Sequence, residues 1–120
     1  MIDEEYFRAW KKRAWQTRQK VQKREDRARQ LARKMAYTLA EEFAVSRVYL
    51  IGSLLHPGCF NLSSDIDLVV EGLDPAKLYQ AERRLEEIVD IPFDLIDGKE
   101  ISKKFYARIL QEGLILYERN

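Results

Sequence analysis

Two aspartates one residue apart, Asp65 and Asp67, are the side chains of this sequence whose type and spacing best suit chemistry. They open an apolar run, and successive side chains of a strand alternate between its faces, so both carboxylates should point the same way. Ile66 and Leu68 then point into the opposite, packed face. Two carboxylates this close repel each other, and a hard divalent cation such as Mg²⁺ offsets the repulsion through oxygen ligands. The spacing therefore predicts a metal site at the start of a strand.

A glycine–serine pair ahead of the aspartates is suited to hold a phosphate group. Gly52 and Ser53 follow residues 47–51, an apolar segment that predicts a buried strand. Glycine lets the backbone approach a ligand closely, and free backbone N–H groups and a serine hydroxyl bind phosphate oxygens. Ser64 lies just ahead of the carboxylates. The turn and the carboxylates meet only if strands 47–51 and 65–70 are antiparallel neighbours, so we expect that pairing.

Asp94 is the expected third carboxylate of the site. It lies in residues 91–96, an apolar segment that predicts a third strand. Two metal ions that flank a transferring phosphoryl group need a further carboxylate besides the first pair. Asp90 and Asp97, at the ends of the segment, are expected to be solvated turn residues.

The composition is that of a single soluble domain. With 120 residues, the chain can bury roughly two thirds of the surface that it exposes when unfolded. Apolar residues make up 46% of the chain and charged residues 34%, and no apolar run approaches the ~20 residues of a membrane span. The first residues are acidic, where a secretory leader would be basic, and the single cysteine, Cys59, cannot form an internal disulfide. We therefore expect a cytoplasmic protein without a membrane partner.

Positive charge is concentrated at the beginning of the chain. Residues 1–34 contain 12 Lys and Arg against 5 Asp and Glu, whereas the remaining residues contain 9 against 15. Residues 3–43 lack Gly and Pro and consist mostly of helix formers, which predicts one long helix or two abutting helices. From Ala28 onward the apolar residues have the spacing of a helix packed on a core, and before it this pattern thins. We therefore predict a protruding, basic, aromatic-containing helical extension, residues 1–27, and a domain of residues 28–120.

Four aromatic side chains in this extension predict an interface. Tyr6, Phe7, Trp10 and Trp15 lie within ten positions of one another, among basic residues. Exposed tryptophans commonly mark an interface, so we expect a protein partner or self-association through this helix. Basic residues interleaved with aromatic ones also suit RNA, which is the second interpretation.

The rest of the chain predicts two further helices beside the three strands. One helix is expected over residues 75–89, after a capping Asp-Pro pair, and another from Ser102 to about residue 111. Residues 114–117 are expected to form a short apolar tail. Strands and helices together place the domain in the α/β (α+β) class.

In order and context, three motifs of this chain resemble the minimal nucleotidyltransferases of the DNA polymerase beta-like superfamily. The motifs are Gly52-Ser53, Ser64-Asp65-Ile66-Asp67-Leu68 and Phe93-Asp94-Leu95-Ile96. The resemblance covers about residues 30–120, including the closing segment 109–118. It implies the nucleotidyltransferase fold, with a small mixed three-stranded sheet flanked by helices.

The same resemblance implies roles for the site residues. The catalytic and metal-binding residues would be Asp65, Asp67 and Asp94, and the nucleotide-binding residues would be Gly52, Ser53 and Ser64. The first two aspartates would bind two Mg²⁺ ions, with Mn²⁺ as an alternative, and Asp94 the ion that activates the acceptor hydroxyl. The chain would transfer a nucleoside monophosphate, most simply AMP from ATP. The resemblance suggests a partner protein as acceptor, a helical ribonuclease of HEPN type in a toxin–antitoxin pair.

The loop between the first two motifs departs from the family pattern. Family members often carry an arginine after the glycine–serine pair, whereas residues 54–60 contain no Lys or Arg. A cation near the triphosphate would offset charge that develops in the transition state, so Arg47 or a basic residue of a partner would have to replace it. Two alternatives therefore stay open. One is a catalytically weak antitoxin subunit that masks its partner, and the other is a nucleotidyltransferase directed to RNA by the basic extension.

Overall fold

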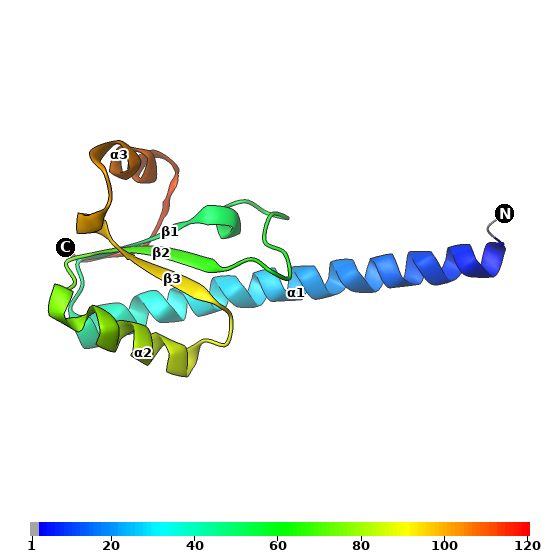
Figure 1. The fold of residues 1–120 in the computed structure, drawn as a ribbon, viewed down its shortest axis with the longest axis horizontal. Coiled ribbons are helices and arrows are strands. Elements are labelled where there is room, and N and C mark those ends of the chain that lie inside the picture. The colour runs from blue at the N-terminus through cyan, green and yellow to red at the C-terminus, as the bar shows by residue number, and fades with distance from the viewer. Residues whose placement is uncertain (1–2) are drawn as a thin grey trace.

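The part of the chain that the structure describes, residues 3–120, forms a four-stranded sheet with helices on both faces. In this computed structural model the helices are α1 (Glu4–Phe43), α2 (Leu78–Ile88) and α3 (Lys103–Glu112). The strands are β1 (Arg47–Ile51), β2 (Ile66–Glu71), β3 (Phe93–Asp97) and β4 (Leu114–Glu118). Short 3-10 turns cover Gly52–Leu55, Pro75–Lys77 and Gly98–Glu100. Figure 1 shows the sheet between α3 and the pair formed by α1 and α2.

Helix α1 begins and ends at residues with clear capping chemistry. The Asp3 carboxylate accepts a hydrogen bond from the backbone N–H of Tyr6 at 2.8 Å, and Glu4 and Glu5 add negative charge that the helix dipole favours in the first turn. The helix ends at Ala44, whose φ of 52° is left-handed. Because the helix is continuous between these caps, the prediction of one long helix is confirmed and that of two abutting helices is wrong.

The strand register brings the predicted site residues to one end of the sheet. The strand order is β3-β2-β1-β4, in which only β2 and β3 are parallel. Ile51 lies opposite Asp67, and Asp67 lies opposite Asp94. The predicted antiparallel pairing of the first two strands is therefore confirmed. We call the end of the sheet where β1 ends and β2 and β3 begin the carboxylate end.

The two faces of the sheet are packed against different helices. The larger core joins α1 and α2 to the sheet through Ala28, Ala32, Met35, Leu39, Val48, Leu50, Ile66, Leu68, Val70, Ala81 and Leu85. The smaller core joins α3 to the other face through Tyr49, Val69 and Ile109. Ile66 and Leu68 are fully buried, as their alternation with the aspartates predicts. The aspartates consequently lie on the face of β2 away from α1.

The fourth strand corrects the sequence prediction of a three-stranded sheet. Residues 114–117, predicted as a tail, form most of β4, which pairs with β1 so that Leu114 lies opposite Leu50. These four residues are all apolar, and an unbroken apolar run has no period of two that would identify a strand. The α/β class and the mixed sheet with flanking helices are confirmed.

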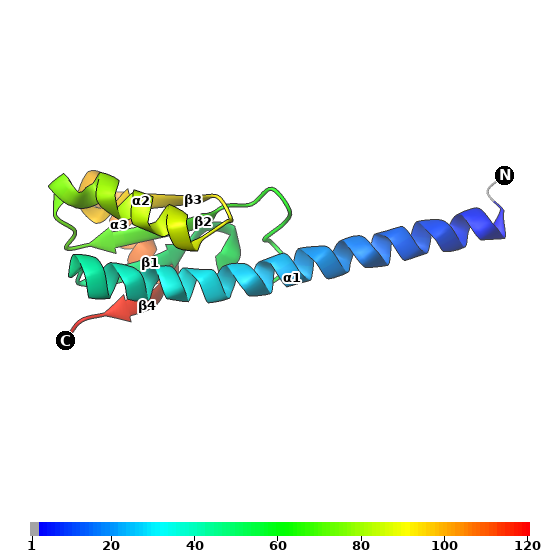
Figure 2. The same ribbon diagram turned by 90° about the horizontal axis from the view of Figure 1, so that it is seen from below.

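Helix α1 continues far beyond the domain at the carboxylate end, as Figures 1 and 2 show. Its contacts with the loop before β2 include Arg24, and the residues before Arg24 are exposed apart from the half-buried Ala14 and Val21. We call residues 4–23 the arm; it makes the molecule 61 Å long but only 32 and 23 Å across. The predicted boundary at residue 27 falls inside this one helix. No helix within residues 3–120 is long and apolar enough to cross a membrane.

Candidate active site

The glycine–serine turn lies directly against one of the predicted aspartates. Gly52 follows β1 with a φ of +81°, a left-handed conformation that side chains other than hydrogen rarely adopt. A Cβ atom added at Gly52 would lie 2.5 Å from Oδ2 of Asp67. Glycine is therefore required here both by the backbone and by the carboxylate, and the turn and the aspartate are neighbours as the sequence predicts.

Asp67 and Asp94 are paired across the parallel strands β2 and β3. Burial raises the pKa of Asp67 above its ordinary value of 3.8, and the carboxylates of Asp94 and Asp65 raise it further. The negative charges of the site thus destabilise one another. A divalent cation between these side chains would relieve that repulsion.

Asp65 is the third member of the acidic group. It lies one residue before β2 and is exposed, so the predicted strand begins one residue later than expected. Within residues 3–120, no three His, Cys, Asp or Glu side chains are already arranged as a metal site. In ligand type the carboxylate oxygens of Asp65, Asp67 and Asp94 nevertheless fit Mg²⁺.

A cavity of about 360 Å³ opens beside the glycine–serine turn. Its lining includes Gly52 and Ser53 on one side and Phe105 and Arg108 of α3 on the other. Its size is within the range of about 300–1,000 Å³ found for small-molecule sites. Arg108 is a basic side chain of the kind that the loop lacks, but Glu112, its ion-pair partner at 3.1 Å, lines the same cavity. The sequence gives no motif for Arg108, because only the packing of α3 on the sheet brings it to the turn.

A larger cavity, of about 490 Å³, lies on the outer side of β3 and is acidic. Its lining includes Glu82, Glu86, Asp90 and Asp94. Four carboxylates repel a triphosphate, so the smaller cavity beside Ser53 is the better candidate for a nucleotide.

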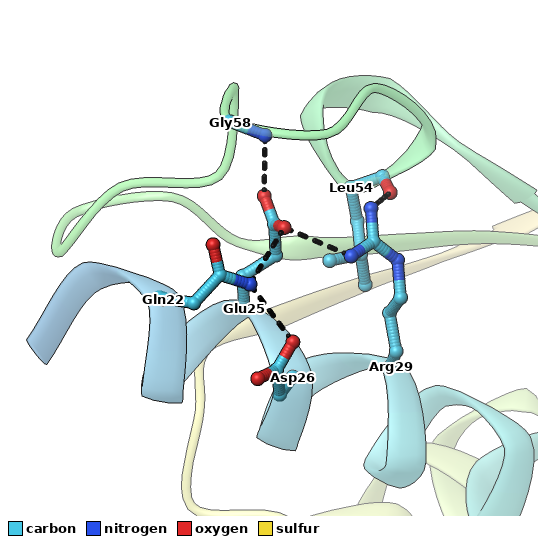
Figure 3. Close-up of polar contacts among 6 residues, drawn as sticks. All are labelled: Gln22, Glu25, Asp26, Arg29, Leu54 and Gly58. Atoms are coloured by element: carbon cyan, nitrogen blue, oxygen red, sulfur yellow. Dashed lines mark hydrogen bonds and ion pairs between the residues drawn. The ribbon is translucent and has the colours of Figure 1, made fainter. Parts of the chain in front are cut away.

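Helix α1 holds the loop that connects the turn to the aspartates, as Figure 3 shows. Glu25 is 2% exposed and accepts hydrogen bonds from the backbone N–H of Gly58 and from Nη1 of Arg29, both at 2.9 Å. Arg29 also donates to the backbone oxygen of Leu54 at 2.9 Å. Burial by itself would raise the pKa of Glu25, but the hydrogen bonds from Arg29 and Gly58 outweigh it and hold this pKa below its ordinary value. Glu25 is therefore a buried, charged brace for the loop.

Arg24 holds the other end of the same loop. Its guanidinium donates to the backbone oxygens of Asn61 at 3.2 Å and Ser64 at 3.0 Å and lies 5.6 Å from the ring centre of the buried Phe60. The Ser64 hydroxyl accepts a hydrogen bond from the backbone N–H of Asn61 at 2.9 Å. The hydroxyl is thus engaged in the turn of the loop itself, and its role in nucleotide binding stays a prediction.

Arg47 does not reach the glycine–serine turn. It begins β1 and Gly52 follows the end of that strand, so the two residues lie at opposite ends of the sheet. Its guanidinium is paired with Glu71 at 3.4 Å and with Glu118 at 3.1 Å. The idea that Arg47 replaces the missing loop arginine is therefore wrong, and Arg108 is the basic side chain that lines the cavity.

The two aspartates at the ends of the third strand are not equivalent. Asp97 is only 7% exposed, and its carboxylate accepts a hydrogen bond from the backbone N–H of Lys99 at 3.0 Å, so the expectation of a solvated residue is wrong there. Asp90 is exposed and forms an ion pair with Arg27 of α1. Both therefore have structural partners of their own.

A mixed sheet that sets a glycine–serine turn against paired aspartates is the arrangement of the nucleotidyltransferase fold. The family model described as "Polymerase beta, Nucleotidyltransferase" matches residues 33–120. The chain therefore belongs to this family of nucleotidyltransferases, as the resemblance seen in the sequence indicates. A search among curated proteins found no match.

Several solved structures share the fold. The chain is similar to a mutant of the toxin–antitoxin pair MntA-HpeT, with 20% identity, a TM-score of 0.59 and 74% of each chain covered. It is similar to a toxin–antitoxin structure with AMP-PNP, with 22% identity, a TM-score of 0.59, and 73% of this chain and 74% of that chain covered. It is also similar to the Shewanella oneidensis complex of a tri-AMPylated HEPN toxin with MNT antitoxin. The identity is 21% and the TM-score 0.56, and the match covers 77% of this chain and 73% of that chain.

Proposed function

We propose that this chain transfers AMP from ATP, in the presence of Mg²⁺, to a hydroxyl group of a HEPN-type partner protein. The observation that carries the proposal is the contact between the Gly52 turn and Asp67, which is itself paired with Asp94. The partner is supported by the similar complex of a tri-AMPylated HEPN toxin with an MNT antitoxin, and the nucleotide by the similar structure with AMP-PNP. The chain would then act as the antitoxin of the pair.

In this proposal the residues divide the work between holding the nucleotide and receiving the acceptor. The triphosphate lies on the backbone N–H groups of the glycine–serine turn, in the cavity that Arg108 also lines. Asp65, Asp67 and Asp94 would hold two Mg²⁺ ions, with Mn²⁺ as an alternative, and bound ions would neutralise charge on the phosphate oxygens. The acceptor oxygen forms a bond to the α-phosphorus while the bond from that phosphorus to pyrophosphate breaks. The exposed Asp94 carboxylate accepts the hydroxyl proton, and pyrophosphate leaves.

Label transfer from ATP tests the proposal. The chain is incubated with Mg²⁺, with the HEPN-type protein encoded beside its gene, and with ATP labelled on the α-phosphate or on the γ-phosphate. Only the α-label should appear on the partner. Asp65→Asn and Asp67→Asn should each reduce the transfer by at least about a hundredfold, since each removes charge from the site. Asp74→Asn is the matched control because Asp74 caps the turn before α2, and asparagine also caps well. Transfer that persists in both site variants would contradict the proposal.

A binding role without efficient transfer is the second candidate function. It is favoured by the loop without Lys or Arg, residues 54–60, and by the finding that no metal site is already arranged within residues 3–120. Here the chain masks its partner, and tight, unlabelled binding would survive Asp65→Asn and Asp67→Asn. The labelling experiment separates the two functions, because label on the partner appears only in the first.

A further inference from the structure

The arm carries an apolar stripe that continues the buried stripe of α1. The stripe consists of Phe7, Trp10, Ala14 and Val21. Its members are three, four or seven positions apart, and Val21 is seven positions before the buried Ala28. At about 100° per residue, the stripe therefore falls in the same arc of the helix as the side chains that pack on the sheet. Trp15 points well outside this arc.

The two aromatic side chains of the stripe are exposed although they are of the kind that proteins bury. Phe7 is 48% exposed and Trp10 is 53% exposed, and their rings stack on each other with centroids 6.1 Å apart. Burying aromatic surface of this kind is worth about 25 cal/mol per Å². The family match begins at residue 33, so the arm lies outside the matched domain. Its stripe is suited to contact a second molecule.

The direction of the stripe restricts the shape of that molecule. Because the stripe lies on the same side of α1 as the domain, the arm and the domain form two sides of a corner, as Figures 1 and 2 show. The domain projects from this side of the helix, so a flat membrane surface cannot lie along the stripe. A convex surface that fits into the corner between the arm and the domain can lie along the stripe.

The charges beside the stripe indicate the chemistry of the molecule that fits. The arm contains seven Lys and Arg against two Glu. By helical position, Lys11 and Arg18 lie along one border of the stripe and Arg13 and Lys20 along the other. An apolar stripe with charged borders is typical of a helix that docks in an apolar groove with a rim of opposite charge. RNA would instead need basic and aromatic side chains interleaved on one face.

A second copy of this chain keeps its acidic cavity, beside β3, apart from the exposed apolar side chains that a docking groove needs. Exposed apolar side chains on the domain occur on α3 and β4, where Leu110 and Leu114 are 55% and 52% exposed. α3, which bears Leu110, also carries Lys103, Lys104 and Arg108, which repel a basic arm. A different protein with an acidic surface is therefore the better occupant.

The corner opens at the carboxylate end of the sheet. Arg24, the first residue after the arm, bonds to Ser64, which directly precedes Asp65. A molecule that covers the stripe therefore also lies beside the loop that leads to the predicted catalytic side chains.

We propose that the arm is the docking element for the acceptor protein. An acidic protein surface with an apolar groove covers Phe7 and Trp10, fills the corner, and so places its acceptor hydroxyl at the carboxylate end. This inference rests on the proposed AMP transfer and adds to it the surface that selects the acceptor.

The docking surface can be tested on the full chain with a fluorescently labelled acidic amphipathic peptide of Leu, Ala and Glu. Fluorescence anisotropy should show binding that weakens as salt rises. The double variant Phe7→Ala/Trp10→Ala should weaken binding at least about tenfold, as loss of an aromatic anchor does. Trp15→Ala is the matched control, since Trp15 is 56% exposed, nearly as much as Trp10, but lies off the stripe. The affinity of the Trp15→Ala variant for the peptide should stay within about twofold of that of the original chain.

The competing occupants are tested in parallel with single-stranded RNA, phosphatidylserine vesicles and the chain alone. The proposal would be overturned if the double variant and Trp15→Ala lost the same amount of peptide affinity. It would also be overturned if the original chain did not bind the peptide. It would also be overturned by tighter binding of the RNA or the vesicles, or by a dimer in sedimentation that the double variant disrupts. Amide NMR signals should shift on peptide binding both in the arm and in residues 54–64, and shifts confined to the arm would exclude the corner.

Failure of docking and failure of transfer are distinguishable. Asp65→Asn and Asp67→Asn should bind the peptide at least as tightly as the original chain does, because the arm is outside the carboxylate group and each change removes negative charge that repels an acidic ligand. Conversely, the double variant should bind ATP with Mg²⁺ normally, yet lose most label transfer to the HEPN-type protein. Normal transfer by the double variant would overturn the docking proposal and leave the proposed function standing.

Discussion

Gly52 illustrates how a single residue joins backbone conformation to the chemistry of the site. Replacing it with alanine should cost about 1–2 kcal/mol of stability from the left-handed backbone and should also displace the Asp67 carboxylate, which lies 2.5 Å from the new Cβ. We expect label transfer to fall at least about tenfold, since small misplacements of catalytic groups have large effects. Transfer rates and thermal unfolding of the same preparation measure both effects.

Gly58 supplies the matched control for this prediction. Its φ of +82° is nearly that of Gly52, but a Cβ added there would meet nothing within 4 Å. Gly58→Ala should therefore lose similar stability and keep its transfer rate. Equal transfer rates in the two variants would show that the contact with Asp67 has no catalytic consequence.

Asp67 should make the stability of the metal-free protein depend on pH. Its folded pKa is raised above 3.8, first by burial and then by Asp94 and Asp65, so folding favours its protonated form. The stability that protonated Asp67 adds to the folded chain is fully present below the pKa that Asp67 has in the unfolded chain. It is lost as the pH rises through the pKa that Asp67 has in the folded chain. From acidic to neutral pH, Asp67→Asn should therefore lose less stability than the original chain. Melting temperatures with EDTA should show this, and Mg²⁺ should reduce the difference; an identical pH dependence would contradict the assigned repulsion.

Local pattern was sufficient to predict the centre of the site and insufficient for its surroundings. Asp67 and Gly52 follow from strand alternation and turn chemistry, which are properties of neighbouring residues. Asp94 required only the assumption that the third strand joins the same sheet, and the register confirms its place beside Asp67. Arg108 could not be predicted, because its position at the turn depends on how α3 packs across the sheet.

The brace between α1 and the loop is a property of elements that are distant in the sequence. Glu25 and Gly58 are 33 positions apart, and Glu25 looks like an ordinary charged residue of a basic helix. The only sequence signal is its position among residues whose spacing faces the core. β4 was missed for a related reason: its apolar run has no alternation, and only pairing with β1 identifies it as a strand.

Removing the brace should loosen the loop without unfolding the domain. Glu25→Ala leaves the backbone N–H of Gly58 and the guanidinium of Arg29 without their buried acceptor, which we expect to cost about 1–3 kcal/mol. Hydrogen exchange of the Gly58 amide should accelerate, and proteolysis within residues 54–64 should become faster.

Glu42→Ala is the control for this change on the same helix. Glu42 also pairs with an arginine, Arg84, but is exposed, so its removal should leave both loop measurements and the melting temperature nearly unchanged. If the Gly58 amide exchanges its hydrogen at the same rate in the two variants, α1 does not hold the loop in the way that the hydrogen bonds indicate.

At the scale of the whole molecule, the charge of the chain is divided between two regions that the fold keeps apart. The basic surplus lies on the arm and the first turns of α1 after it, whereas the acidic surplus lies on the domain, where carboxylates gather at one end of the sheet. An acidic acceptor is attracted by the arm and repelled by the bare site. Docking therefore has to come from the arm, and cations at the site have to reduce the repulsion before transfer.

This division predicts that the arm is dispensable for folding and necessary for transfer. A chain without residues 1–18 keeps every buried residue of α1, the first of which is Glu25, so its melting temperature should change by only a few degrees. ATP binding with Mg²⁺ should be unchanged, because the cavity beside Ser53 is lined by residues of the domain. Label transfer to the HEPN-type protein should nevertheless fall at least about tenfold at physiological salt, since the aromatic anchors and most of the basic borders are removed. Calorimetry and the labelling assay on the same preparations measure this, and full transfer by the shortened chain would mean that the domain alone recognises the acceptor.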